Sequence, residues 1–430
     1  MKKEEKKVPQ LRFPEFTGDW EQRKLSDIVD VLDGDRGKNY PTSDDFDISG
    51  HTLFLNASNV TNDGFLFQDN QFITEEKSNS MGNGKLEDDD IVVTSRGSLG
   101  HIAWYNADIS SFVPYARINS GMLILRNKKE VETEYLYHFM KSSKGQSQIS
   151  FISFGSAQPQ LTKKGVEDLE VILPKRRDEQ VQLGYYFSNL DHLITLHQRK
   201  LEKIKKFKKG VMQKLFSQEV RFKADDGSDF PEWEEKSFSD VFENLNNSTF
   251  SRNCLNYEAG NVKYIHYGDI LTKFGFAIDV QSSNVPYVNE GLDCEKYASL
   301  SDGDIVIADT AEDDTVGKAV EIMNAHCGKT ISGLHTIACH PREKFASKYL
   351  GYFMNADIYH NQLRPYMQGI KVTSVSKTNI VLTKISVPCL AEQQKIADCL
   401  SALDEVIEKQ KATLAVWEEL KKGLLQQMFV

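Results

Sequence analysis

The chain has 430 residues, 40% of them hydrophobic and 10% aromatic, which is enough for several domains with real cores and argues against disorder. Its net charge of −10 argues against indiscriminate binding to polyanions, although nucleic-acid binding depends on where the basic residues lie. No run approaches the roughly 18 apolar residues of a membrane span, no signal peptide is visible, and six cysteines without a C-x-x-C pair favour a reducing cytoplasm.

Four segments follow one another along the chain. Residues 1–173 carry strand-like runs typical of a mixed domain, and residues 174–216 form a long helix entered through Pro174. Residues 217–386 repeat the plan of the first segment, and residues 387–430 form a second long helix entered through Pro388. Proline is tolerated there because the first N–H groups of a helix have no partner within it. We therefore expect an α+β fold of two similar globular domains and two long helices.

The second half of the chain repeats the first. Glu179–Phe216 and Glu392–Phe429 align without a gap and match at 12 of 38 positions. Trp20-Glu21, near the start of the first domain, recurs as Trp233-Glu234 at the start of the second. Solenoid repeats have units of roughly 20–50 residues, so a period this long indicates duplication of a whole domain.

Both helices carry a heptad pattern, which is typical of coiled-coil packing. The central seam positions are Leu190, Ile194, His197 and Leu201 in the first helix, and Leu403, Ile407, Gln410 and Leu414 in the second. The polar interruptions coincide, since His197 aligns with Gln410 and Lys208 with Lys421. Chance spacing of apolar residues would not place the interruptions at matching steps.

The order of the segments predicts the direction of the helices. The second domain begins where the first helix ends, so the second helix has to run back along the first to bury its seam. We expect an antiparallel, pseudo-twofold pair with His197 facing Gln410 at the centre. A helix of about 38 residues rises roughly 57 Å at ~1.5 Å per residue, which would hold the two domains apart.

We find no sequence signature of catalysis: there is no P-loop, HExxH, GxSxG or GxGxxG pattern. We therefore predict no catalytic residue, no metal site and no cofactor in this chain. The acidic stretches Glu87–Asp90 and Glu312–Asp314 leave open a stand-alone, metal-dependent DNA-cutting enzyme. The spacings among His326, Cys327, His335, Cys339 and His340 fit no common zinc finger, and the first domain has no counterparts.

Polar, glycine-bearing loops follow the predicted strands and differ between the two domains. Their side chains are of the kinds that read base edges and hold phosphates. In the first domain the candidates are Asn56, Ser58, Asn59, Ser95, Arg96, Ser98, Ser156, Gln158, Gln160 and Lys163, and in the second His266, Tyr267, Thr310, Gln368, Lys371, Thr373, Ser376 and Lys377. Eight basic residues between His197 and Lys214 indicate either proximity to phosphates or a solvated helix face.

The chain resembles the specificity subunit of type I restriction–modification systems over essentially its full length. The resemblance rests on residues 155–162 (GSAQPQLT), on the repeated Glu179-Gln180 and Glu392-Gln393 pairs, and on Leu424–Phe429. The second domain has Gly369–Val372 where the first has the GSAQPQL stretch, so its contact residues transfer less directly.

The resemblance implies a non-catalytic DNA-binding subunit of a prokaryotic, cytoplasmic complex. In the family, each domain reads one half of a bipartite double-stranded site, and the antiparallel helices set the gap between the halves. Two methyltransferase subunits and two restriction subunits are the implied partners, and S-adenosylmethionine, ATP and magnesium are expected only on those partners. A coiled-coil scaffold for proteins is the other reading that stays open.

Overall fold

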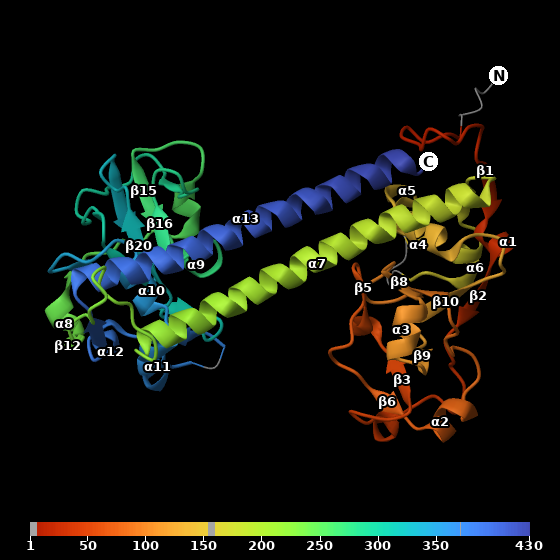
Figure 1. The fold of residues 1–430 in the computed structure, drawn as a ribbon, viewed down its shortest axis with the longest axis horizontal. Coiled ribbons are helices and arrows are strands. Elements are labelled where there is room, and N and C mark those ends of the chain that lie inside the picture. Colours follow the sequence, from red (N-terminus) through yellow and green to blue (C-terminus); the bar gives the residue numbers. More distant parts are fainter. Residues whose placement is uncertain (1–6, 154–159, 370) are drawn as a thin grey trace. The chain divides into compact units, whose positions relative to one another are not determined.

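The computed structural model describes residues 7–153, 160–369 and 371–430, which fall into two compact units. Unit 1 holds the described residues up to Gln198 together with Ala412–Val430, and unit 2 holds Arg199–Lys411. The boundaries lie inside the two long helices, α7 (Arg177–Phe216) and α13 (Leu390–Met428), which are each continuous (Figure 1). Each unit therefore combines one globular part with part of each helix, so the predicted segments 1–173, 174–216, 217–386 and 387–430 do not coincide with the compact units.

The main sheet of unit 1 is antiparallel and has α4 (Thr133–Lys141) on one face. Its strand order is β2 (Val29–Asp33), β10 (Met122–Asn127), β7 (Asp90–Thr94), β8 (Ile102–Tyr105). Ile91 and Val93 pack with α4, whereas Val92 packs on the other side with Leu53 and Leu55. Strand β7 is buried along its whole length because both of its faces are covered, which explains its continuous apolar run.

The remaining elements of unit 1 are short. Strand β3 (Thr52–Leu55) pairs antiparallel with β6 (Phe72–Ile73) and parallel with β9 (Ala116–Ile118). Two further antiparallel pairs join β1 (Glu21–Lys24) to β11 (Glu170–Leu173) and β4 (Val60–Thr61) to β5 (Gly64–Phe65). The other helices are α1 (Leu25–Ile28), α2 (Glu75–Ser80), α3 (Ala107–Phe112), α5 (Ser143–Ser153) and α6 (Lys163–Glu167).

Unit 2 repeats this topology. Its main sheet has the order β13 (Phe242–Leu245), β22 (Thr336–Pro341), β18 (Ile305–Ala308), β20 (Ala319–Met323), followed by an additional parallel strand, β16 (Ala277–Asp279). The second sheet has the order β14 (Leu255–Asn256), β17 (Tyr287–Val288), β15 (Val262–Ile265), β21 (Lys329–Ser332), and β15 and β21 are parallel, as β3 and β9 are in unit 1.

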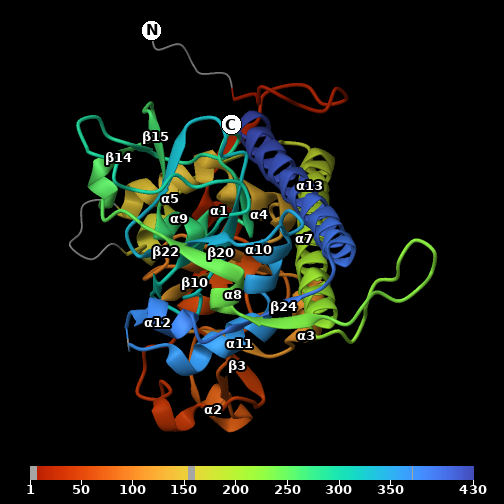
Figure 2. The ribbon, with the colours of Figure 1, turned by 90° about the vertical axis from the view of Figure 1, so that its left-hand side faces the viewer.

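Short pairs and helices complete unit 2 (Figure 2). The antiparallel pairs join β12 (Glu234–Ser237) to β24 (Lys384–Val387) and β19 (Thr310–Ala311) to β23 (Thr373–Ser374). The helices are α8 (Phe238–Val241), α9 (Tyr267–Thr272), α10 (Tyr349–Met354), α11 (Asp357–Leu363) and α12 (Lys377–Ile380). Among the described residues, no helix has both the length and the apolar character needed to cross a membrane.

A buried glutamate anchors the first turn of α7 in unit 1. The Arg12 guanidinium donates to both carboxylate oxygens of Glu179, at 2.7 and 2.8 Å, and the Trp20 indole donates to one of them at 3.2 Å. Gln180 accepts from the Glu132 N–H and donates to the Pro174 carbonyl. These contacts satisfy the buried polar groups and hold the helix start against the globular part.

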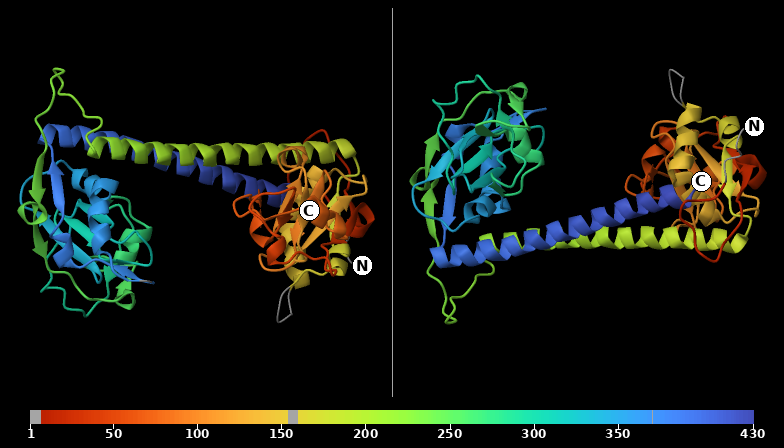
Figure 3. Two further views of the ribbon diagram at one scale, coloured as in Figure 1. Left: turned by 90° about the horizontal axis from the view of Figure 1, so that it is seen from below. Right: turned by 90° about the horizontal axis from the view of Figure 1, so that it is seen from above.

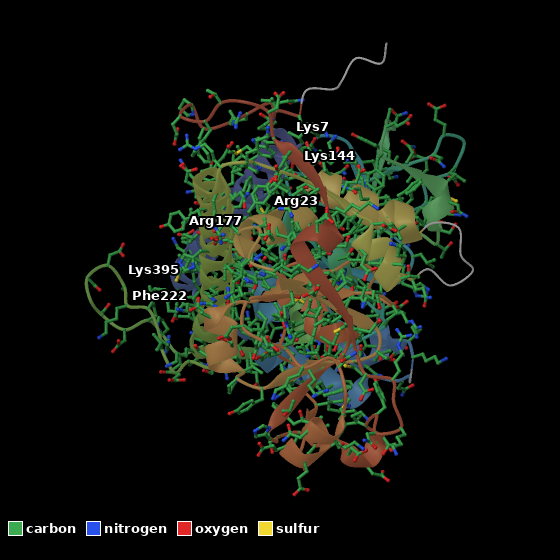
Figure 4. The ribbon with its side chains drawn as sticks, turned by 90° about the vertical axis from the view of Figure 1, so that its right-hand side faces the viewer. Lys7, Arg23, Lys144, Arg177, Phe222 and Lys395 are labelled. Atoms are coloured by element: carbon green, nitrogen blue, oxygen red, sulfur yellow. The ribbon has the colours of Figure 1, made fainter. Side chains whose placement is uncertain are left out.

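The same contacts recur at the start of α13 in unit 2. Arg221 donates to both oxygens of Glu392, at 3.1 and 2.9 Å, and the Trp233 indole donates at 3.0 Å. Gln393 accepts from the Ala346 N–H and donates to the Pro388 carbonyl. The repeated tryptophan of the Trp-Glu pair and both residues of the Glu-Gln pair therefore attach each long helix to its globular part. Farther along α13, Lys395 pairs with Asp225 at 2.6 Å and donates to the Lys223 carbonyl, beside Phe222 (Figure 4).

Within each unit the stretches of α7 and α13 lie side by side and antiparallel (Figure 3). In unit 1, Phe187 contacts Phe429 and Asp191 pairs with Lys421. In unit 2, Lys208 pairs with Asp404 at 2.5 Å. The aspartate of the repeated Leu-Asp pair and the first lysine of the repeated Lys-Lys-Gly stretch thus form an interhelical ion pair, once in each unit.

Candidate nucleic-acid interface

The same backbone hydrogen bonds join the loops at the strand ends of both units, and we call this arrangement the backbone frame. In unit 1 the Ser95 N–H donates to the Gly121 carbonyl at 2.7 Å, and the Ser95 carbonyl accepts from the Leu161 N–H at 3.0 Å. In unit 2 the Asp309 N–H donates to the His335 carbonyl at 3.1 Å, and the Asp309 carbonyl accepts from the Val375 N–H at 2.9 Å. The frame brings together three loops that are far apart in sequence. Because Ser95 and Asp309 make equivalent hydrogen bonds, the residues after Thr94 correspond to those after Ala308. Leu161 and Val375 are likewise equivalent, so Gln160 corresponds to Ser374.

The first recognition surface comprises the loops at residues 56–59, 94–98 and 119–121 of unit 1, together with Gln160. The exposed Arg96 donates from Nε to the Gln160 side-chain oxygen at 3.1 Å. A Cβ at Gly97, where φ is +73°, would lie 3.8 Å from the Ala57 Cβ, so the first two loops are adjacent. Two candidates that are 64 residues apart in sequence are thus brought into direct contact.

Several residues predicted to contact DNA are buried or bonded within the loops and stabilise the loop conformation. Asn59 is fully buried, donates to the Leu66 carbonyl and accepts from the Asn56 N–H. Ser95 is also buried. The Asn56 side chain accepts from the N–H and the hydroxyl of Ser58. Asn59 and Ser95 therefore hold the loops in shape, while the Ser58 and Arg96 side chains are exposed.

The other candidates of unit 1 lie at the edge of this surface or beyond the described part of the chain. Ser98 is exposed, and its carbonyl accepts from the Thr94 hydroxyl. Lys163, also exposed, begins α6 and lies 3.9 Å from Glu167. Ser156 and Gln158 fall outside the described residues. The Arg36 guanidinium donates to the Ser120 carbonyl at 3.2 Å, so a turn that carried no specific signal in the sequence joins the surface.

The second recognition surface comprises His266, Tyr267, Thr310 and His335 of unit 2. The His266 ring stacks on Tyr267 at 4.7 Å, and the Tyr267 ring contacts the edge of His335 at 5.3 Å. The Thr310 hydroxyl donates to Asp309 at 2.7 Å and lies 3.4 Å from His335 Nδ1. Sequence reasoning treated His335 only as a rejected zinc ligand, because its place beside Thr310 depends on pairing between distant strands.

His266 is held neutral. Its Nδ1 accepts from the Gly268 N–H at 3.0 Å, so the ring proton of the neutral form is on Nε2. Burial, with a further contribution from the nearby Arg252 charge, lowers the pKa of His266 to about 4. At neutral pH this side chain is therefore a hydrogen-bond donor without charge.

The remaining candidates of unit 2 lie before, within and after β23. Gln368 and Ser374 exchange two backbone hydrogen bonds, at 3.0 and 2.9 Å, and Thr373 is paired with Ala311. Ser376 caps α12 by accepting from the Asn379 N–H. The side chains of Gln368, Lys371, Ser376 and Lys377 are exposed, and that of Thr373 is half-buried.

Asp89, Asp90 and His340, from the acidic and His/Cys groups of the sequence, are engaged in contacts within the fold. Asp90 pairs with Arg126 at 2.8 Å, and Asp89 accepts from the Trp104 indole at 2.8 Å. His340 contacts Asp304 at 2.5 Å, and Cys339 is buried. Within residues 7–153, 160–369 and 371–430, no three His, Cys, Asp or Glu side chains are grouped closely enough to hold a metal ion.

The predicted seam residues differ in burial. Those that are buried are Leu190, Ile194, Leu201, Ile407 and Gln410, while His197, Leu403 and Leu414 are half-buried. The His197 ring stacks on Trp417 at 6.2 Å within unit 1. The facing of His197 and Gln410 stays a prediction, since the two residues belong to different units.

A family model and curated relatives match this chain over most of its length. The family model of the type I restriction modification DNA specificity domain matches the chain twice, at residues 17–206 and 231–416. Two specificity subunits of type I restriction enzymes from Methanocaldococcus jannaschii, MjaX and MjaVIII, are each 24% identical to the chain; both alignments cover 98% of this chain, and 95% and 93% of the relatives.

Solved structures share the fold. The S subunit of a type I restriction–modification system from M. genitalium superposes with a TM-score of 0.54 at 15% identity, covering 98% of this chain and 99% of that one. A chain from a study of complex assembly and conformational transition of the type I R-M system gives a TM-score of 0.57 at 16% identity, covering 96% and 98%.

Proposed function

This chain belongs to the family of type I restriction–modification DNA specificity proteins, and we propose that it is the DNA-recognition subunit of such a system. Unit 1 reads one half of a bipartite double-stranded site with its first recognition surface. Unit 2 reads the other half with its second recognition surface. The chain itself has no catalytic role, and the chemistry belongs to its partners.

The observation that carries this proposal is one backbone frame with two sets of side chains. Arg96 and Gln160 of unit 1 occupy the places of Thr310 and Ser374 in unit 2. At base edges in the major groove arginine donates, glutamine both donates and accepts, and threonine makes contact through its hydroxyl or methyl group. A conserved frame with exchanged side chains is what two readers of different half-sites require.

The long helices support a second part of the proposal, that they set the gap between the half-sites. Helix α7 has 40 residues, which corresponds to about 60 Å at ~1.5 Å per residue. Half-sites one helical turn apart on the same DNA face are separated by roughly 34–36 Å. A continuous helix of this length is long enough to span that separation.

The helices also support docking of partner subunits. Val181 and Tyr185 on α7, and Val416 and Leu420 on α13, expose apolar side chains within unit 1. Apolar side chains that a helix leaves exposed offer contacts to a partner protein. We propose two methyltransferase subunits as the partners that cover it, with two restriction subunits in the full complex of the prokaryotic cytoplasm. S-adenosylmethionine, ATP and magnesium are then bound by those partners.

The methylome of the host tests the proposal. Long-read sequencing with and without this gene is expected to show loss of one bipartite methylation motif when the gene is deleted. An unchanged methylome would contradict the proposal. So would magnesium-dependent cleavage of DNA by the purified chain without partner subunits.

The gap is tested separately. Inserting the same one or two helical turns into α7 and α13 is expected to lengthen the unspecified gap of the methylated motif and leave both half-sites unchanged. The matched control inserts the same residues into the exposed turn at Asp226–Ser228, outside both helices. An unchanged gap in a folded, methylating variant would refute the role of the helices.

A further inference from the structure

A charged cluster borders the second recognition surface and has no counterpart in the described part of the first. It comprises Arg252, Tyr257, Asp269 and Lys273. Arg252 donates to both carboxylate oxygens of Asp269, at 2.8 and 2.9 Å, and Lys273 Nζ lies 2.9 Å from the same carboxylate. Both cations also donate to the Tyr257 hydroxyl, at 3.0 and 2.8 Å.

The burial of these groups is uneven. The Asp269 side chain has 0% exposure, whereas those of Arg252 and Lys273 are 42% and 48% exposed. A buried carboxylate thus holds two cations that face solvent. Burial tends to raise the pKa of Asp269, but hydrogen bonds from Arg252 and Lys273 outweigh it and lower that pKa, so the carboxylate stays ionised.

The charges do not balance. Two cations around one carboxylate leave one positive charge in excess at the surface. One cation is enough to compensate a buried carboxylate, so the second has no such structural requirement. The Arg252 guanidinium has five N–H donors, of which the three hydrogen bonds to Asp269 and Tyr257 leave some for an oxyanion.

The cluster adjoins the residues proposed to read bases. A Cβ at Gly268 would lie 3.3 Å from His266 Nδ1 and 3.8 Å from an Arg252 terminal nitrogen, so Arg252 lies directly beside the His266–Tyr267 stack. Proteins commonly place phosphate contacts next to base contacts, because the former fix the register of the latter.

The first unit differs at the equivalent place. Asn56 and His266 both cap the turn after a parallel strand, and Asn59 and Asp269 both lie three residues later. Asn59 donates to the Leu66 carbonyl and gathers no cation. The anchoring charge is therefore a property of unit 2.

We propose that Arg252 and Lys273, positioned by the buried Asp269, bind a backbone phosphate of the DNA next to the half-site that unit 2 reads. This inference rests on the proposed function. Asp269 is a positioning residue that contacts no DNA itself. The two cations anchor the duplex without contributing to the choice of sequence.

The salt dependence of binding tests this inference. Arg252→Gln and Lys273→Gln are each introduced into the complex of this chain with its methyltransferase subunits. Each variant is expected to bind a duplex that carries the recognised motif, and a duplex of random sequence, about tenfold more weakly than the wild type. The slope of log affinity against log salt concentration is expected to fall in magnitude by about 1. The methylation motif is expected to stay the same.

Two further variants control for folding and position. Arg252→Gln leaves one cation beside one carboxylate, with no positive charge in excess. The double variant Arg252→Gln/Asp269→Asn leaves Lys273 as one uncompensated positive charge and is expected to recover most of the slope that Arg252→Gln loses. Arg342→Gln is the matched control: Arg342 is 51% exposed, is paired with Glu243 at 3.6 Å, and follows the opposite end of β22 from His335. It is expected to leave the slope unchanged.

The outcomes separate the two proposals. If the wild-type complex shows no sequence-specific binding, the proposed function fails. If the wild type binds specifically and the Arg252 and Lys273 variants behave like Arg342→Gln, the phosphate anchor fails and the function stands. A changed second half-site, in place of uniform weakening, would also overturn the anchor, because it would show base reading.

Discussion

Units 1 and 2 share the contacts that attach the long helices to the globular parts, and they differ in the side chains at the strand ends. Both bury a glutamate under a bidentate arginine and a tryptophan indole, and both pair a lysine of one long helix with an aspartate of the other. At the strand ends, Arg96 and Gln160 of one unit are replaced by Thr310 and Ser374 in the other. The duplication therefore preserved the supports and exchanged the side chains proposed to meet DNA.

The largest effect is expected where the units agree most closely. Glu392→Ala leaves Arg221 and the Trp233 indole without their buried acceptor, and Glu179→Ala does the same to Arg12 and Trp20. Each is expected to cost about 3–5 kcal/mol. Thermal unfolding followed by circular dichroism measures the loss.

The control for this prediction is Glu232→Ala. Glu232 also pairs with Arg221, at 3.7 Å, but its side chain is 93% exposed, so its removal is expected to cost at most about 0.5 kcal/mol. Equal losses for Glu232→Ala and Glu392→Ala would show that burial of the glutamate does not matter.

A pH dependence is expected from a buried glutamate of unit 2 whose equivalent in unit 1 is not a carboxylate. Glu321 of β20 accepts from the backbone N–H groups of Lys348 and Gly351, and the equivalent position of β8 in unit 1 is Trp104. Burial raises the pKa of Glu321 from 4.5 to about 7. Because the folded state keeps a proton that the unfolded state releases, stability is lost as pH rises from about 4.5 to about 7, by roughly 3 kcal/mol.

The test compares wild type with Glu321→Gln between pH 5 and pH 7. Glutamine does not ionise, so the melting temperature of the variant is expected to rise relative to that of the wild type as pH increases. Trp104→Phe in unit 1 is the matched control, and its difference from wild type is expected to be independent of pH. Parallel curves for wild type and Glu321→Gln would remove Glu321 as the source.

The surfaces that differ are expected to affect specificity and not stability. Arg96→Ala removes the exposed guanidinium that contacts Gln160, and is expected to relax the first half-site by about 1–3 kcal/mol at one base pair. Thr310→Ala is the counterpart in unit 2 and is expected to change the second half-site only. Methylome sequencing measures both, and a change in both half-sites from either variant would contradict separate reading.

The sequence predicted the parts of the fold that depend on local pattern. Duplication, heptad spacing and apolar runs indicated the two long helices and the paired domains, because periodicity is visible without tertiary contacts. It did not predict the role of Glu179 or Arg12, since their contact joins residues 167 positions apart.

The candidate sites were less accessible to sequence reasoning. Polar loop composition indicated Arg96 and Gln160, but it did not distinguish the exposed Ser58 from the buried Asn59. His335 and Arg252 were missed because their places depend on strand pairing and on a buried carboxylate. These features are set by tertiary structure, which single-sequence patterns do not report.

The smallest effect is expected from the interhelical ion pairs, which agree in their charges and differ in their surroundings. Lys208 lies 4.7 and 5.0 Å from the ring centres of Phe276 and Tyr352, and the Tyr352 hydroxyl donates to its partner Asp404 at 2.7 Å. In unit 1, Lys421 pairs with Asp191, and His138 lies 4.0 Å from that carboxylate.

Lys208→Met is therefore expected to cost about 1 kcal/mol more than Lys421→Met, because it also removes two cation–π contacts. For units of this size the difference corresponds to roughly 2–4 °C in melting temperature. Burial lowers the pKa of Lys208, so the charged form is the disfavoured one in the folded protein, and wild-type stability relative to Lys208→Met is expected to rise as pH approaches 10.5. Equal losses from the two lysine variants would show that the aromatic rings contribute nothing beyond packing.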